Sequence, residues 1–213
     1  VITVENYSKK ILVTKGVPIN KMAVVYNGLP KAILQNNLDK NTWNLNKDDF
    51  IIGCVSRIDP VKGINFLIDA FYGLQNKFGN KLKLVIIGEG TVKNELEKQV
   101  NDLGLSESVV FTSYQNNITD WLQIFDIFAL PSLSEYHSIG LLEAMRSKKA
   151  IVATNVGGNP ESIRHLKEGL LVDSKSIEQL FDAISQLFIN KGLAKELGGN
   201  AQKRFNNNFS ENA

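Results

Sequence analysis

The sequence has little that would cross-link the chain or hold it in a membrane. A single cysteine, Cys54, occurs among its 213 residues, which excludes an intrachain disulfide framework. Cys54 lies within an apolar run, so we expect a packed core residue rather than a reactive thiol. No apolar run approaches about 18 residues and no signal peptide is recognisable, so neither a membrane-spanning helix nor secretion is predicted.

A marked excess of either charge is missing as well. The 24 Lys and Arg residues and the 22 Asp and Glu residues give a net charge of +2, and the two signs are interspersed. Nucleic acid is therefore not an expected partner. The hydrophobic share of 43% and the charged share of 22% are typical of a soluble globular protein. The length suffices for one full domain and a fragment of another.

The chain divides by pattern into a βαβ fragment, a polar linker, a main domain and a tail, at residues 1–34, 35–49, 50–205 and 206–213. The first segment predicts a strand, a helix and a short strand ending in Asn27-Gly28, a unit too small to fold alone. The second is Asn-rich and indicates a surface loop. Because the chain starts at Val1 without a methionine, we expect a piece of a longer protein.

Short apolar runs typical of buried parallel strands recur through the main domain, at residues 51–55, 82–87, 109–111, 126–130, 150–154 and 169–172. Helical patterns separate these runs, as in the apolar stripe of Leu67, Phe71, Leu74 and Phe78. No hairpin signal interrupts the alternation. The predicted fold class is α/β, with a Rossmann-like, doubly wound parallel sheet.

The stretch 131–145 connects one of these strands to an apolar helix and is the most informative part of the sequence. Ser138 is a predicted N-cap of the helix. The free amides of the first turn, from Ser138 through Ile139 and Gly140 to Leu141, then form a site that favours an anion such as phosphate.

Two carboxylates flank this anion site, Glu135 on the approach loop and Glu143 within the helix. A glycosidase-type acid/base pair would place the two carboxyl groups roughly 5 to 9.5 Å apart. Eight residues of continuous helix rise about 12 Å, which fits poorly. A better interpretation has each glutamate holding hydroxyl groups at a different part of one long ligand. The alternative is that both are solvated surface residues.

Other polar residues and glycines follow neighbouring strands, where ligands bind in open α/β sheets. Arg57 and Lys62 share one strand-to-helix loop, and two cations in one loop favour a phosphate ligand over simple solvation. Gly88 and Gly90 follow the next strand and would let the backbone approach a ligand closely. Gly-x-Gly without a third glycine is a weak signal.

Several motifs resemble those of one enzyme family. Glu135 and Glu143, in Pro-Ser-x-x-Glu-x-x-x-x-Gly-Leu-Leu-Glu-Ala-Met, resemble the Glu-x7-Glu signature of retaining GT-B glycosyltransferases of family 4, also called group 1. The segment 56–63 is similar to the family's Gly-Arg-x-x-x-x-Lys-Gly, with Ser56 in place of its glycine. Residues 21–28 are similar to the interdomain crossing, and residues 157–161 to the Gly-Gly-x-x-Glu turn that helps to shape the donor pocket. The resemblance implies the C-terminal, donor-binding half of a GT-B fold.

The resemblance also implies roles for individual residues. Arg57 and Lys62 would be catalytic, because they hold the donor diphosphate and stabilise the departing nucleoside diphosphate. Glu135 would be catalytic by orienting the donor sugar, and Glu143 would bind the ribose. Tyr114 and Gln115, in the loop after the strand at 109–111, would contact the nucleotide base, although a loop tyrosine is commonly half-buried packing.

One position departs from the family, which often has Phe-Gly two residues after the first glutamate. This chain has His137-Ser138 there, which leaves the choice of donor sugar open. His137 is a candidate contact of the substrate, and the alternative is an inert, exposed loop histidine.

The expected function is transfer of a sugar, with retention, from a nucleotide-diphospho-sugar to a glycan- or lipid-linked acceptor bound by the missing N-terminal domain. No cofactor and no metal are expected, because there is no Asp-x-Asp and the cations already neutralise the phosphates. The expected location is cytoplasmic, with peripheral contact at the inner membrane face left open. Two alternatives remain: a related phosphorylase or sugar-phosphate synthase, and a nucleotide-sugar-binding module without turnover.

Overall fold

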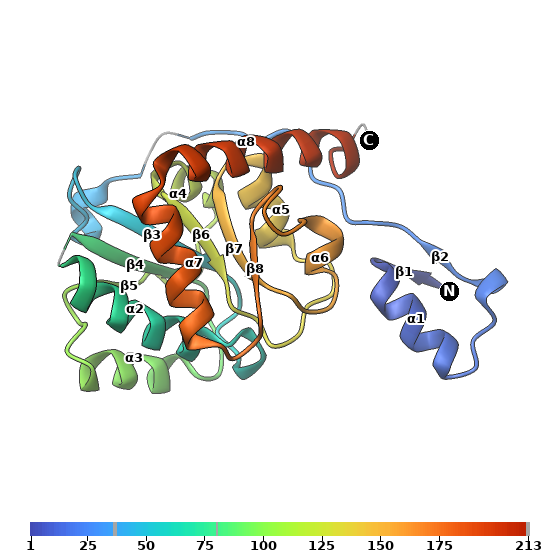
Figure 1. Cartoon of the computed structure of the whole chain (residues 1–213), viewed down its shortest axis with the longest axis horizontal. Helices are drawn as coiled ribbons and strands as arrows, with labels where there is room; N and C mark the ends of the chain where they lie inside the picture. Colours follow the sequence, from blue (N-terminus) through green and yellow to red (C-terminus); the bar gives the residue numbers. More distant parts are fainter. Residues whose placement is uncertain (36–37, 80, 212–213) are drawn as a thin grey trace.

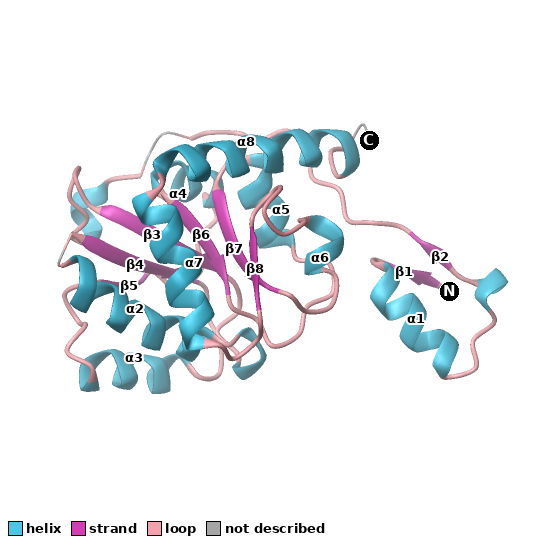
Figure 2. Cartoon of the chain, in the orientation of Figure 1, coloured by secondary structure: helices cyan, strands magenta, loops and turns pink. Residues whose placement is uncertain are grey.

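The computed structural model describes residues 1–35, 38–79 and 81–211, and a parallel sheet of six strands forms the centre of this part of the chain (Figures 1 and 2). The strands follow the order β5-β4-β3-β6-β7-β8 across the sheet. Their bounds are β3 Phe50–Val55, β4 Leu82–Ile87, β5 Val109–Phe111, β6 Ile127–Leu130, β7 Ala150–Thr154 and β8 Leu170–Val172. The predicted Rossmann-like α/β class is confirmed.

Helices cover both faces of the sheet, which explains why the strands are apolar throughout. Alternate residues of β3 point to opposite faces: Ile52 and Cys54 belong to one core layer and Ile51 to the other. The first layer packs against α2 (Ile64–Phe78), α3 (Lys93–Asp102) and α7 (Ile177–Ile189). The second packs against α4 (Ile118–Ile124), α5 (Ile139–Arg146) and the end of α8 (Lys191–Asn208).

Cys54 confirms its expected role as a core residue. It is fully buried in the first layer, and burial raises the pKa of its thiol to about 12. The predicted stripe on α2 is confirmed as well, because Leu67, Phe71 and Leu74 are buried. Phe78 is partly buried against the same cluster.

The order of the strands reverses at β3 and β6, and this reversal positions the candidate site. The chain first moves outward from β3 to β4 and β5, then returns to β6 on the other side of β3. Direct pairing of Ile52 with Ile127 and of Gly53 with Phe128 makes β3 and β6 neighbours. The loops that leave their carboxyl ends therefore lie side by side, at the place where open α/β sheets bind ligands. The first of these loops contains a 3-10 turn, η3 (Pro60–Lys62).

Residues 1–25 form a small unit beside the main sheet (Figure 1). It contains the parallel pair β1 (Ile2–Thr3) and β2 (Ala23–Val24), the helix α1 (Asn6–Thr14) and the turn η1 (Ile19–Lys21). The predicted strand–helix–strand order is thus present. Glu161 of α6 (Asn159–Ser162) anchors this unit, because its carboxylate accepts hydrogen bonds from the amides of Asn6 and Tyr7, both at 2.9 Å.

Two segments pack more closely than their composition suggests. In the expected surface linker 35–49, Leu45 is buried and Trp43, in the turn η2 (Lys40–Trp43), packs edge-on against Trp121 at 5.5 Å between ring centroids. In the expected tail 206–213, α8 continues to Asn208 and Phe209 is buried. Residues 36–37 and 212–213 of these two segments lie outside the described residues.

Candidate functional site

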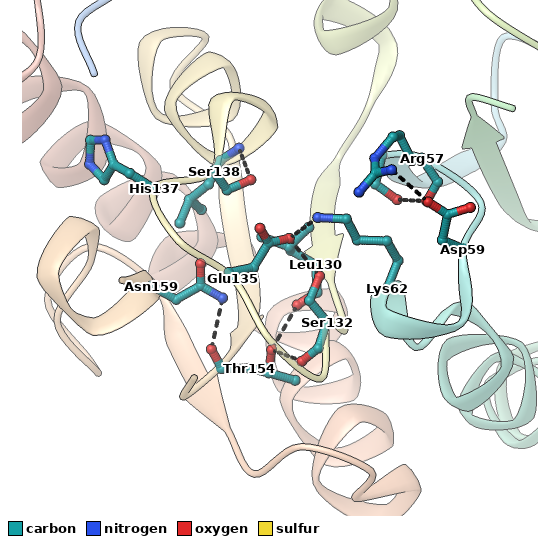
Figure 3. Close-up of polar contacts among 12 residues, drawn as sticks. Arg57, Asp59, Lys62, Leu130, Ser132, Glu135, His137, Ser138, Thr154 and Asn159 are labelled. Atoms are coloured by element: carbon teal, nitrogen blue, oxygen red, sulfur yellow. Dashed lines mark hydrogen bonds and ion pairs between the residues drawn. The ribbon is translucent and has the colours of Figure 1, made fainter. Parts of the chain in front are cut away.

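Glu135 and Lys62 meet at the switch point of the sheet. Lys62 lies at the end of η3 and Glu135 in the β6–α5 loop (residues 131–138), and Lys62 Nζ donates to Glu135 Oε1 at 2.6 Å (Figure 3). Both side chains are largely buried, with 15% of Lys62 and 7% of Glu135 exposed. Because the charges are paired in a poorly solvated place, the pair fixes the direction of both side chains.

Ser132 gives Glu135 a second donor. Its buried hydroxyl donates to the same Oε1 at 2.7 Å. Both donors therefore bind Oε1, and no donor of the described chain is assigned to Oε2. Thr154, at the end of β7, donates to the Ser132 carbonyl at 2.6 Å and so holds the start of the loop. The carboxylate of Glu135 is therefore oriented before any ligand arrives.

The backbone of the β6–α5 loop rests on the loop after β7. Gly157 has a φ of +51°, and a side chain there would place its Cβ 1.7 Å from the Glu135 carbonyl. At Gly158 a Cβ would lie 2.0 Å from the Tyr136 carbonyl, and the Gly158 amide donates to the Glu135 carbonyl. This is the predicted Gly-Gly-x-x-Glu turn. Gly158 caps α6, and Asn159 donates its side-chain amide to the Thr154 carbonyl.

The start of α5 has the predicted cap. Ser138 Oγ accepts from the Leu141 amide at 3.4 Å, so the prediction that the Leu141 amide is free is wrong. Within the described chain, the amides of Ile139 and Gly140 have no intrahelical acceptor, so these two N–H groups of the first turn are available to a ligand. Gly140 brings α5 close to β3, because a Cβ there would lie 2.8 Å from the Val55 carbonyl. A helix start of this kind favours a negatively charged ligand.

Next to this helix start is a cavity of about 530 Å³. Its lining comes from the loops after β3, β4 and β5 and from α4 and α5, and comprises Val55, Ser56, Arg57, Ile87, Gly88, Glu89, Tyr114, Gln115, Asn116, Ile118, Thr119 and Glu143. The volume lies in the range of small-molecule sites. Burial raises the pKa of Glu143, and the nearby Arg146 opposes that shift in part.

Arg57 lies at the open side of the cavity. Its guanidinium pairs with Asp59 at 2.9 Å, and 74% of its side chain is exposed (Figure 3). A surface pair of this kind is weak, so a phosphate could draw the guanidinium away from Asp59. Arg57 and Lys62 thus belong to one loop but differ in burial and partner.

The predicted base-contact and glycine positions line the cavity only in part. Tyr114 is 73% exposed at the rim, and Gln115 lines the wall while its amide donates to the Thr112 carbonyl. Gly88 lines the cavity, whereas Gly90 is not among its lining residues. Both glycines are required by the protein's own backbone, because a Cβ would meet the Ser56 carbonyl at 2.0 Å at Gly88 and the Ile58 carbonyl at 2.2 Å at Gly90. Close approach of a ligand to them stays a prediction.

His137 differs most from its expected place. The interpretation as an exposed loop histidine is wrong, because 4% of the residue is exposed. The ring packs between Tyr26 and Phe209, with centroids 5.2 and 5.1 Å away, and points away from Lys62 (Figure 3). Burial lowers the pKa of His137 to about 4. Its side chain therefore gives no support to a direct substrate contact.

Three residues of this site have roles that the sequence did not indicate: Ser132, Thr154 and Asn27. The motif Pro-Ser-x-x-Glu placed Ser132 near Glu135, but its hydrogen bond depends on the loop's conformation. Asn27 lies 110 positions from His137 and donates a hydrogen bond to it. This contact depends on how residues 21–28, the crossing segment, pack against the β6–α5 loop. Within the described residues, no group of three or more His, Cys, Asp or Glu side chains is arranged to hold a metal ion. Nor does any helix in that part have the length and apolar character to cross a membrane.

The chain is similar in sequence to a known protein family and to individual proteins. The family model described as glycosyl transferases group 1 matches residues 35–204. A GDP-mannose-dependent alpha-(1-6)-phosphatidylinositol monomannoside mannosyltransferase of Mycobacterium tuberculosis is 32% identical over 68% of this chain and 40% of that protein. The capsular polysaccharide biosynthesis glycosyltransferase CapM of Staphylococcus aureus is 27% identical over 97% of this chain and 56% of its own length. The chain thus spans roughly half of the curated relatives that it matches.

Solved structures show the same architecture. The C-terminal domain of a glycosyl transferase group 1 family protein from Francisella tularensis has a TM-score of 0.72 at 29% identity, over 84% of this chain and 96% of that domain. Anabaena HepE in complex with UDP and glucose has a TM-score of 0.86 at 23% identity, over 98% of this chain and 58% of that one. The second likeness shows the GT-B fold.

Proposed function

This chain belongs to the group 1 glycosyl transferases, and from that premise we propose that it is the donor-binding half of a retaining glycosyltransferase of family 4. The observation that carries the proposal is the Lys62–Glu135 pair, which at the switch point joins the loop that bears Arg57 to the loop that leads into α5. Cation, helix amides and carboxylate are the groups that a diphosphate linked to a sugar requires.

In this proposal the donor spans the switch point. Glu143 accepts hydrogen bonds from the ribose hydroxyls, and Tyr114 and Gln115 lie beside the base. The diphosphate lies against the amides of Ile139 and Gly140, with Arg57 turned from Asp59 toward it. Lys62 has three N–H donors, so it can keep Glu135 and still donate to a phosphate oxygen.

The proposed reaction breaks the bond between the anomeric carbon and the diphosphate oxygen. The acceptor oxygen forms its new bond to the same face of that carbon, and the acceptor's proton leaves with the nucleoside diphosphate. Arg57, Lys62 and the α5 amides stabilise the negative charge of the leaving group. Oε2 of Glu135, to which no donor of the described chain is assigned, holds the sugar and faces the positive charge that develops on it in the transition state. These residues neutralise the phosphates without a metal or cofactor.

Named relatives support the class of donor and acceptor. One is a GDP-mannose-dependent enzyme of phosphatidylinositol monomannoside, and another, from Escherichia coli, is a UDP-Gal:alpha-D-GlcNAc-diphosphoundecaprenol galactosyltransferase. We therefore propose a nucleotide sugar as donor and a glycan- or lipid-linked acceptor, with a cytoplasmic location and peripheral contact at the membrane. Because the chain spans roughly half of such relatives, a second candidate is a module that binds nucleotide sugar without turnover by itself.

Calorimetric titration of the chain and of Glu143→Gln and Glu135→Gln with UDP and GDP tests the proposal. We expect one of the two nucleotides to bind, and Glu143→Gln to weaken it about tenfold or more, because a ribose contact is lost. Glu135→Gln should change affinity for the nucleoside diphosphate less than about threefold, since it faces the sugar. Glu97→Gln, on α3 outside the cavity, is the control. Unchanged affinity in both site variants would refute the division of roles.

A further inference from the structure

Asn27, in the crossing segment (residues 21–28), donates two hydrogen bonds to His137 at the end of the β6–α5 loop. The Asn27 backbone amide donates to His137 Nδ1 at 3.0 Å, and the Asn27 side chain donates to the His137 carbonyl at 2.9 Å. The rings of Tyr26 and Phe209 pack against the imidazole. Segments from near both ends of the chain therefore meet at His137.

We propose that His137 is a positioning residue, through which the crossing segment fixes the diphosphate-binding start of α5. The inference rests on the proposed function, since it concerns the same donor site. His137 precedes Ser138 directly, and Ser138 caps α5. A shift of His137 would therefore move the cap and the free amides of Ile139 and Gly140 together.

Other supports of the loop act at its earlier residues. Ser132 and Lys62 hold the Glu135 side chain, and Gly157 and Gly158 support the backbone at Glu135 and Tyr136. None of these contacts reaches His137 or Ser138. Of these supports of the loop, the contact with Asn27 is thus the one nearest to the helix start, which itself packs on β3 at Gly140.

The hydrogen bond at Nδ1 indicates that His137 acts in this chain through its acceptor and not only through its bulk. Nδ1 accepts a hydrogen bond, so the proton of the neutral ring lies on Nε2. Nε2 is buried and has no hydrogen-bond partner within the described chain, which is unfavourable. A phenylalanine would fill the space between Tyr26 and Phe209 without that cost, but it would leave the Asn27 amide without an acceptor.

Two variants separate the acceptor from the ring. His137→Phe keeps an aromatic ring and removes the acceptor. It loses one unpaired N–H at Nε2 and creates another at Asn27, so we expect a Tm within about 2 °C of the wild type. His137→Asn keeps an acceptor at the position of Nδ1 and loses the ring contacts, so its Tm should fall by several degrees.

Binding of UDP and GDP to the two variants, measured by calorimetry beside thermal unfolding, tests the inference. We expect His137→Phe to weaken the nucleotide that the wild type binds by about fivefold or more, and His137→Asn to bind within about twofold of the wild type. Wild-type affinity in His137→Phe, or losses that follow Tm in both variants, would overturn the positioning role alone. A wild-type chain that binds neither nucleotide would overturn the proposed function together with it.

Discussion

Glu135 and Arg57 belong to the same candidate site, yet the protein holds them in opposite ways. Glu135 is buried, paired with Lys62 and hydrogen-bonded to Ser132, on a loop whose backbone packs against Gly157 and Gly158. Arg57 is 74% exposed and has only the weak partner Asp59 within the described chain. Glu135 is therefore held in place before a ligand binds, whereas the exposed guanidinium of Arg57 can adjust to the ligand.

This difference has an energetic consequence. A buried ion pair adds little net stability, but removing one partner leaves a desolvated charge and is strongly unfavourable. An exposed pair is worth little whichever partner is removed. Substitutions at the two ends should therefore differ in stability far more than in their effect on ligand binding.

The largest effect is expected at the buried end, from Lys62→Met. Glu135 would lose its counter-charge, and we expect a loss of about 3–5 kcal/mol in the free energy of unfolding, measured by urea denaturation. Lys98→Met is the matched control, because Lys98 pairs with Asp102 on the exposed surface of α3 and its loss should cost under about 1 kcal/mol. The double variant Lys62→Met with Glu135→Gln should recover part of the loss. Equal stability of the two lysine variants would contradict the contrast between the ends.

A smaller effect is expected from pH, through His137, a buried residue of the same loop. Burial lowers the pKa of His137 from 6.5 to about 4, so the folded state favours the neutral ring. The unfolded chain binds a proton below pH 6.5, so this contribution is complete above pH 6.5 and is lost as pH falls toward 4. At pH 4.5 we expect the wild type to lose about 2 kcal/mol more than His137→Phe, each relative to its own value at pH 7.5. If the free energy of unfolding fell equally with pH in the wild type and in His137→Phe, this contribution of His137 would be disproved.

The smallest effect on stability is expected at the exposed end, from Arg57→Ala. Its free energy of unfolding should stay within about 0.5 kcal/mol of the wild type, because the Arg57 guanidinium is solvated and Asp59, 20% exposed, keeps the Thr91 hydroxyl as a donor. Nucleoside diphosphate affinity should fall about fivefold or more, and Arg57→Lys should restore part of it. If unfolding measurements instead showed a loss as large as that of Lys62→Met, the two ends would not differ as described.

The strands could be predicted from the sequence because each is a short run buried on both faces. β4, β5 and β7 have the predicted bounds, and β3, β6 and β8 differ by one residue at one end. The packing of Trp43, Leu45 and Phe209 could not be predicted in this way. Each lies in a polar stretch, and its apolar partner is far away in the sequence, as Trp121 is from Trp43.

The candidate site was predictable as a set of loops but not as a set of contacts. Arg57, Lys62 and Glu135 follow strands, and ligand sites in such sheets lie at the carboxyl ends of strands. The direct contact of Lys62 with Glu135 depends on β3 and β6 being neighbours, which is a property of the strand order. The burial of His137 could not be predicted for a related reason. It comes from Tyr26 and Phe209, which are far from His137 in the sequence, and no local sequence pattern indicates that they pack against this loop.

The outermost place of β5 in the sheet makes one wall of the cavity exchangeable. This strand has three residues and pairs with β4 on one side, and the loop after it carries Tyr114 and Gln115 to the rim. Grafting a loop of another length here would leave the hydrogen bonds between β3 and β6 intact. Under the proposed function, an exchange of this loop would change selectivity for the nucleobase independently of the groups proposed to act on the sugar.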